Sequence, residues 1–167
     1  MKGDFYMKES GKYIVFRVNN EEYAIDIDRV IAIERVENIS PVPHLPSYVK
    51  GITLSRGHLV PVLDIEDIFY HQSLAIEDEV RTLVLQGEGF EYGLLVADTK
   101  EIIEISSNQI EKIDLLAHFE LSYMAGVANL NARLITVIDT AAFIRTLEGM
   151  EEIDSYINEL KQEQQAT

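Results

Sequence analysis

The sequence contains no cysteine, and this absence removes several kinds of chemistry at once. Disulfides, thiolate nucleophiles, cysteine-ligated zinc and iron–sulfur clusters are all excluded. A chain without cysteine also fits a reducing compartment, where disulfides would not persist.

Long hydrophobic runs are missing as well. Residues Met1 to Tyr6 lack the apolar stretch that a signal peptide needs. No later run approaches the roughly 18 apolar residues of a membrane-spanning helix. We therefore expect a cytoplasmic protein without direct membrane insertion.

Basic residues are scarce, since 14 lysines and arginines face 29 acidic residues and leave a formal net charge of −15. Such a balance repels phosphate backbones and anionic lipids, so we expect no nucleic-acid partner. An acidic surface that keeps the protein soluble accounts for the excess without any partner.

Recognisable catalytic motifs are also lacking. The histidines, at positions 44, 58, 71 and 118, are too scattered to form a metal-binding motif. Neither a glycine-rich phosphate loop nor a G-x-S-x-G elbow occurs. The sequence thus predicts no catalytic residues, no metal site and no cofactor. Two alternatives stay open: a small barrel that binds nucleic acid, and an enzyme that uses clustered carboxylates with a metal.

The chain does contain many short apolar runs separated by turn residues. These runs pair into hairpins at 13–28, 49–63, 81–97 and 124–138. Residues 30–36 fit either a strand or a short helix, and three prolines make 39–48 an extended connector. Short strands with few helical patterns favour small barrels over an alternating strand–helix fold. Near the end, Ile153, Ile157 and Leu160 form the apolar stripe of an amphipathic helix.

The spacing of these runs indicates an internal duplication. Gly51 precedes Asp64 by 13 residues, and Gly126 precedes Asp139 by the same 13. Each copy has the order glycine, apolar run, turn with an arginine, apolar run, aspartate, short helix. The competing interpretation is that any two hairpins look alike. The two aspartates are expected to cap their helices, because a carboxylate at a helix start accepts backbone N–H groups.

Arg56 lies at the tip of an otherwise apolar hairpin, between Ser55 and Gly57. It is either a solvated turn residue or a polar anchor beside an apolar contact surface.

These features together resemble the CheW family, the adaptor proteins of bacterial chemotaxis arrays. The resemblance extends over about residues 12–147 and is carried by Glu22 to Ile27, Val49 to Gly57, Pro61 to Ile65, Tyr92 to Asp98, Tyr123 to Val127, and Ile138-Asp139. It implies a mostly β fold of two pseudo-repeated five-stranded SH3-like β-barrels that share a core. Residues 12–147 would form this intertwined CheW-like domain, and residues 148–167 would add an amphipathic helix and a frayed tail.

The resemblance also implies a function without catalysis. Family members couple chemoreceptors to the histidine kinase CheA, binding the cytoplasmic tip of the receptor and the regulatory domain of the kinase. Receptor binding in the family uses a groove near the junction of the two barrels. The positions associated with receptor or kinase coupling correspond here to Val30, Gly51, Arg56, Gly57, Gly93 and Ile102.

Two departures from the family pattern bear on the partner. The usual Asn-Leu-Arg-Gly stretch is Leu54-Ser55-Arg56-Gly57 here, and a commonly acidic position is Ala32. These changes leave an alternative function, an adaptor in a receptor–kinase array outside chemotaxis. Val30, Ile33, Ile102 and Ile105 are apolar residues that could line a binding groove, although burial in the core is their more common fate.

Overall fold

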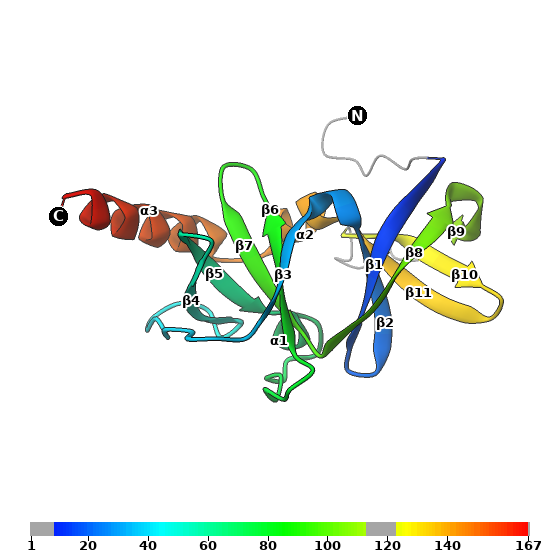
Figure 1. Cartoon of the computed structure of the whole chain (residues 1–167), viewed down its shortest axis with the longest axis horizontal. Coiled ribbons are helices and arrows are strands. Elements are labelled where there is room, and N and C mark those ends of the chain that lie inside the picture. Colours follow the sequence, from blue (N-terminus) through cyan, green and yellow to red (C-terminus); the bar gives the residue numbers. More distant parts are fainter. Residues whose placement is uncertain (1–8, 113–122, 167) are drawn as a thin grey trace. The chain divides into compact units, whose positions relative to one another are not determined.

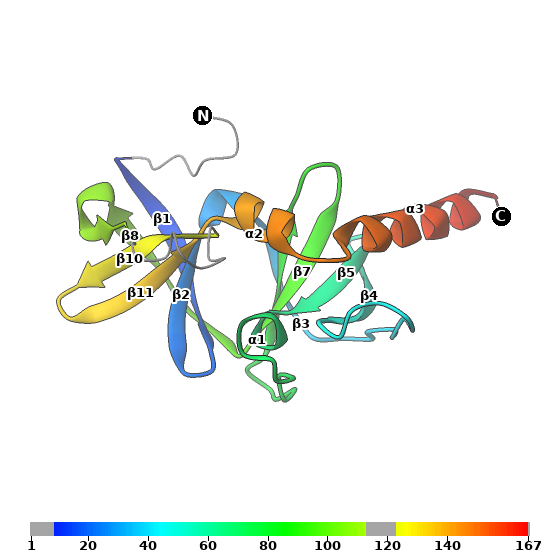
Figure 2. The ribbon, with the colours of Figure 1, turned by 180° about the vertical axis from the view of Figure 1, so that it is seen from behind.

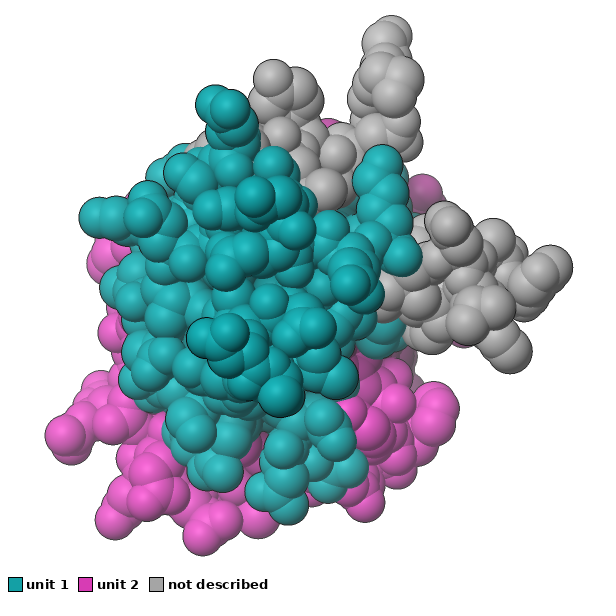
Figure 3. Space-filling view, turned by 90° about the vertical axis from the view of Figure 1, so that its right-hand side faces the viewer, with its two compact units in different colours: residues 1–30, 98–147 teal, residues 31–97, 148–167 magenta. Residues whose placement is uncertain are grey.

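A computed structural model describes residues 9–112 and 123–166, and the predictions made for Met1 to Tyr6 and for His118 lie outside them. The chain divides into two compact units, coloured separately in Figure 3. Unit 1 comprises residues 1–30 and 98–147, and unit 2 comprises residues 31–97 and 148–167. Both units are built mainly from strands, as predicted.

Unit 1 is a sheet in the order β8-β1-β2-β11-β10-β9 (Figure 1). The two ends of this order, β8 and β9, are separated in the sequence only by the 3₁₀-helix η2, Ser107–Gln109. The chain segment from β8 to β9 therefore lies along both edges of the sheet and closes it into a barrel. Without η2, β8 and β9 would be one continuous strand. The strand bounds are β1 Ser10–Val18, β2 Glu21–Asp26, β8 Asp98–Ser106, β9 Ile110–Glu111, β10 Met124–Leu130 and β11 Arg133–Ile138.

Unit 2 contains a five-stranded sheet in the order β3-β6-β7-β5-β4. Beyond β3, a bridge between Ser40 and Ile52 returns the chain to the edge of β4. The stretch that the sequence left open is a strand, preceded by the 3₁₀-helix η1, Ile27–Arg29. The strand bounds are β3 Val30–Arg35, β4 Val49–Ser55, β5 His58–Asp64, β6 Arg81–Gln86 and β7 Glu91–Val96.

The predicted duplication is present, but its two copies exchange strands. In the first copy, β1 and β2 belong to unit 1, whereas β3, β4, β5 and helix α1 (Ile65–Tyr70) belong to unit 2. In the second copy, β6 and β7 belong to unit 2, and β8 to β11 with helix α2 (Thr140–Thr146) belong to unit 1. Equivalent parallel pairs complete the two sheets: β2 pairs with β11, and β7 pairs with β5. Figures 1 and 2 show both sets of strands.

The two glycines of the repeat occupy matching bulges. The β4–β5 register shifts between Val49 and Gly51, and the β10–β11 register shifts between Met124 and Gly126. A Cβ on Gly51 would lie 2.2 Å from the carbonyl oxygen of Ser40, and one on Gly126 would lie 2.6 Å from that of Glu111. Only glycine permits a second backbone to pass this closely, which explains its recurrence.

Pro61 departs from expectation, because a proline inside a strand argues for an edge or a bulge. It lies in β5, which has neighbours on both sides, opposite Ile52 of β4. The ladder from β5 to β7 starts only at Val62. The missing N–H of Pro61 therefore falls just outside that ladder and interrupts no bond in it.

Each unit has its own apolar cluster. Unit 1 buries Tyr13 and Val15 of β1 against residues of β2, β8, β10 and β11. Unit 2 buries Val62, Val80 and Leu95 together. The predicted amphipathic helix forms as α3, Met150–Ala166, and contacts β5 with its apolar stripe buried at Ile153 and Ile157 (Figures 1 and 2). No helix of the described residues is both long and apolar enough to cross a membrane.

The two repeated aspartates cap their helices, as predicted. Asp64 accepts hydrogen bonds from the backbone N–H groups of Glu66, Asp67 and Leu74, and lies 3.7 Å from Lys50 Nζ. Asp139 accepts one from Ala142. Within residues 9–112 and 123–166, the two caps have the same place in the repeat but different numbers of partners.

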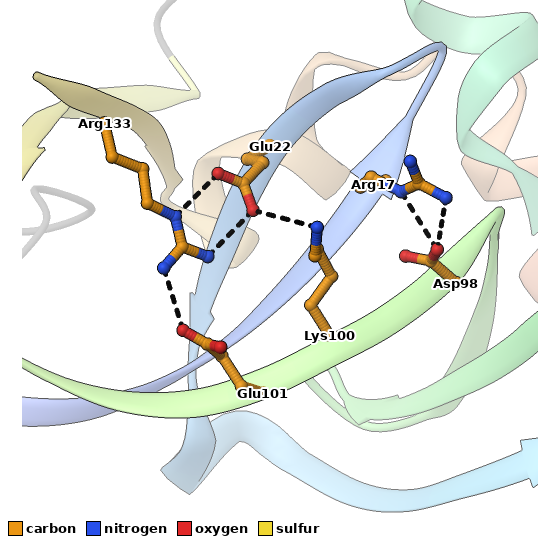
Figure 4. Close-up of polar contacts among 6 residues, drawn as sticks. All are labelled: Arg17, Glu22, Asp98, Lys100, Glu101 and Arg133. Atoms are coloured by element: carbon orange, nitrogen blue, oxygen red, sulfur yellow. Dashed lines mark hydrogen bonds and ion pairs between the residues drawn. The ribbon is translucent and has the colours of Figure 1, made fainter.

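Charged side chains connect three strands of unit 1 (Figure 4). Arg133 of β11 donates from Nε and Nη2 to the two carboxylate oxygens of Glu22, each at 2.8 Å, and from Nη1 to Glu101 of β8 at 2.8 Å. Lys100 adds a weaker contact to Glu22 at 3.9 Å. The hydrogen bonds from Arg133 lower the pKa of the Glu22 carboxyl below its usual 4.5, and the two carboxylates raise the pKa of Arg133.

Because the two aspartates have different numbers of hydrogen-bond partners, their substitution should reduce the free energy of unfolding by different amounts. Asp64→Ala leaves three backbone donors without their carboxylate, while Lys50 keeps its ion pair with Asp67 at 3.6 Å, so we expect a loss of about 3 kcal/mol in the free energy of unfolding. Asp139→Ala removes one capping bond and should cost about 1 kcal/mol. Denaturant unfolding of both variants measures the difference. Equal losses would contradict the greater role assigned to Asp64.

The lowered pKa of Glu22 predicts a pH dependence. Because the folded-state pKa lies below the unfolded value, the contribution to stability is fully present above about pH 4.5 and is lost as the pH falls through the folded-state pKa. Glu22→Gln should therefore destabilise the protein by about 1 kcal/mol at pH 7, with the difference shrinking below pH 4.5. Urea unfolding at several pH values measures this difference. Glu104→Gln, at an exposed acid of the same unit, should show no such pattern, and a constant difference for Glu22→Gln would refute the linkage.

Candidate functional site

The turn between β4 and β5 places Arg56 at the tip of a hairpin in unit 2. Arg56 and Gly57 have φ values of 51° and 81°, the positive pair that a type I′ turn requires. Asparagine and glycine are the usual residues in such turns, and an asparagine at φ 54° does occupy the equivalent position 131. An arginine in this conformation is unusual, because its Cβ is crowded there.

The guanidinium of Arg56 is held by an acid from another strand. Its Nη2 donates to Glu91 Oε1 of β7, and the arginine side chain remains 40% exposed. Beneath the turn, the buried hydroxyl of Ser55 donates to Glu34 Oε2 of β3 at 2.9 Å. Arg56 also lines a pocket between the facing edges of β3 and β4, whose walls include Glu34, Leu54 and Thr82 of β6. The charged group is therefore oriented and still accessible.

Exposed apolar side chains lie on the same two strands. Leu54 of β4 is 64% exposed, and Ile31 and Ile33 of β3 are 36% and 43% exposed. Strand β3 alternates half-buried and exposed positions along its whole length, so its outward face is apolar at these two positions. An oriented arginine beside exposed aliphatic residues is the composition of a protein-contact surface.

Three of the predicted site residues are glycines, and they have different surroundings. Gly57 has open space where a Cβ would be. Gly51 forms the β4 bulge, and a Cβ on Gly93 of β7 would lie 2.6 Å from Thr82 Cγ2. Gly51 and Gly93 are buried, so in this structure they act through the packing of the backbone.

The remaining predicted residues lie in unit 1. Val30 is its last residue before β3 continues into unit 2, and it is half-buried. Ile102 of β8 is 55% exposed and follows Glu101 of the charged cluster described above. Leu134, which follows Arg133 on β11, is 61% exposed. Of the four apolar residues considered for a groove, Ile105 is core, whereas Ile33 and Ile102 are exposed.

Several of these residues, in one unit or the other, had no signal of their own in the sequence. Glu91 lies 35 residues from Arg56 and is one acid among 29. Ile31, Leu54 and Leu134 are exposed although their type favours the core. The period-two alternation in β3 could have indicated two faces, but not which face is exposed.

Comparison with known proteins places these features in a family. The family model described as "CheW-like domain" matches residues 12–148. A chemotaxis protein CheW of Bacillus subtilis is 31% identical over 105 residues, which cover 63% of this chain and 67% of that protein. A chemotaxis protein CheW of Rhizobium meliloti is 30% identical over 129 residues, covering 75% of this chain and 82% of that protein.

A solved structure supports the same assignment. The scaffolding protein TtCheW from Thermoanaerobacter tengcongensis superposes with a TM-score of 0.75 at 25% identity, covering 83% of this chain and 94% of that chain. The fold class and the family predicted from the sequence are therefore confirmed. The chain belongs to the CheW-like domain family.

Proposed function

We propose that this protein is a non-enzymatic adaptor of the cytoplasm that couples chemoreceptors to a CheA-type histidine kinase. Family membership supports the adaptor role, since its relatives are named as chemotaxis proteins and a scaffolding protein. The observation that carries the proposal is Arg56, held in a left-handed conformation at a hairpin tip beside exposed apolar residues.

The backbone of Arg56 gives a physical reason to assign it a role in binding. A residue other than glycine at this φ costs on the order of 1 kcal/mol, which asparagine reduces. The second copy of the repeat uses asparagine at the same place. An arginine kept in the less favourable conformation, with its charge directed by Glu91, is better explained by contact with a partner than by stability.

The partners are the regulatory domain of the kinase and the cytoplasmic tip of a receptor. A receptor tip is a helical hairpin, and helices bind to surfaces that offer aliphatic anchors with a polar residue at the rim. We assign Arg56, Gly57, Val30 and Ile102 to these contacts. Gly51 and Gly93 support them from within the sheet.

A receptor–kinase array outside chemotaxis remains the alternative setting. Leu54 stands where the family commonly has asparagine, and its side chain is 64% exposed. This substitution makes the surface more apolar at a contact position. Binding to a chemotaxis kinase and to its receptors, measured separately, distinguishes the two settings.

The role of Arg56 is tested with Arg56→Asn. Asparagine suits the left-handed turn, so the thermal midpoint should stay within about 2 °C of the unmodified protein. The lost guanidinium should weaken binding of the kinase regulatory domain or of the receptor fragment about tenfold, as interface arginines commonly do. Calorimetric titration with each fragment measures the affinities.

The matched control is Lys12→Asn, which removes an exposed positive charge from β1 of unit 1. It should leave both affinities unchanged. Arg56→Asn with both affinities intact would exclude Arg56 from the site, and no binding of either fragment by the unmodified protein would refute the adaptor proposal.

Alanine substitutions at Gly51 and Gly57 distinguish a glycine that is needed for backbone packing from one that is exposed at the turn. Gly51→Ala places a Cβ 2.2 Å from the Ser40 carbonyl oxygen, so we expect a loss of stability of more than about 2 kcal/mol. Gly57→Ala meets no neighbour within 4 Å but keeps a φ of 81°, and should cost about 1 kcal/mol. Denaturant unfolding ranks the two. A smaller loss for Gly51→Ala than for Gly57→Ala would contradict the packing role of Gly51.

A further inference from the structure

Helix α3 forms one wall of a groove in unit 2. Two adjoining pockets lie between α3 and the rest of the unit, one against β4 and β5 and the other against the proline-containing loop before β4. Val42 of this loop and Tyr156 of α3 line both pockets. The two pockets therefore form one groove along the helix, which we call the α3 groove.

Both walls of the α3 groove carry apolar residues. The sheet contributes Leu54 and Leu59, the loop contributes Val42 and Leu45, and the helix contributes Tyr156 and Leu160. All six are exposed or half-buried, so contact area remains available on both walls.

Its rim carries charge of one sign. Glu152, Glu159 and Glu163 line the groove, as does Glu151. Neither pocket has a lysine or arginine among its lining residues, all of which belong to the described part of the chain. Glu152, Tyr156, Glu159 and Glu163 follow each other at intervals of three or four residues, so they share one face of α3.

The helix is held firmly enough to serve as a wall. Ile153 and Ile157 are 1% and 2% exposed. At the helix start, the Tyr48 hydroxyl donates to the carbonyl oxygen of Glu148. Burial, together with Glu148 and Glu152, raises the pKa of Tyr48 to about 12, so this hydroxyl keeps its proton at neutral pH.

We propose that the α3 groove binds an amphipathic helix of another protein, one with an aliphatic stripe and lysine or arginine residues along its edge. The aliphatic stripe would cover the walls, and the basic residues would face the glutamates of the rim. From Glu152 to Glu163 the rim extends about 16 Å, the length of three helical turns.

Charge argues for this occupant over the other candidates. A second copy of the chain has a net charge of −15 and offers an acidic α3, so it would be repelled. Anionic lipid would be repelled for the same reason. The family model matches residues 12–148 and does not include α3, so the α3 groove is proposed separately from the contacts of Arg56, although Leu54 belongs to both surfaces.

The test uses two synthetic 18-residue helical peptides with the same leucine stripe, one flanked by lysines and the other by glutamates. The lysine peptide should bind, and its amide shift changes should centre on Val42 and Tyr156. The glutamate peptide should not bind. Glu152→Gln with Glu159→Gln should weaken the lysine peptide about three- to tenfold, since each exposed ion pair contributes modestly.

Two further variants separate the groove from general attraction to an acidic protein. Tyr156→Ala should weaken binding at least as much as the double substitution, while circular dichroism shows α3 retained, because alanine favours helices. Glu104→Gln with Glu111→Gln removes the same two charges from exposed positions of unit 1 and should change nothing. Absence of binding, shift changes centred elsewhere, or an equal loss in this control would overturn the proposal.

Discussion

The parallel pairing of strands from different copies of the repeat is the constraint on which the rest of the structure depends. Tyr23 and Ala24 pair with Thr136 and Val137, and Gly93 to Leu95 pair with Val62 to Asp64. Parallel pairs need long connections. The connection between β2 and β11 is most of the chain, and the one between β5 and β7 contains α1 and β6. Each unit therefore combines strands from both copies of the repeat. The hairpins, helix caps and bulges of a unit all lie within a sheet that this exchange completes.

Within this shared plan the two copies have diverged at the positions that face solvent or carry charge. The first copy has Arg56-Gly57 in its turn, and the second has Asn131-Ala132, with positive φ in both. Leu54 in the first copy corresponds to Asn129 in the second, and Lys50 beside the first cap corresponds to Ala125. The backbone needs are the same in both copies, so these differences reflect separate uses of the two hairpins.

Much of the fold could be predicted because its signals are local. Hairpin turns, the two capping aspartates and the apolar stripe of α3 each lie within a few residues of one another. The exchange of strands could not be predicted from the spacing of the repeat, because the distance from Gly51 to Asp64 and from Gly126 to Asp139 is the same for exchanged and unexchanged copies; only the family resemblance implied intertwined subdomains.

The site was less accessible to sequence analysis, for a related reason. Arg56 could be singled out from its turn, but its partner Glu91 is brought to it only by the sheet. The contact between Glu22 and Arg133 joins residues 111 apart. Exposure of Ile31, Ile33 and Leu54 depends on which sheet face is covered, and periodicity gives alternation without saying which side is buried.

The exchanged topology also has an implication for how such a chain could arise. A single copy of the repeat would leave its first two strands without their partners, so it would be complete only after trading them with a second molecule. That is the arrangement of a domain-swapped dimer. Joining two such molecules into one chain makes the trade internal and independent of protein concentration. It also frees each half to acquire side chains of its own without disturbing a symmetric interface.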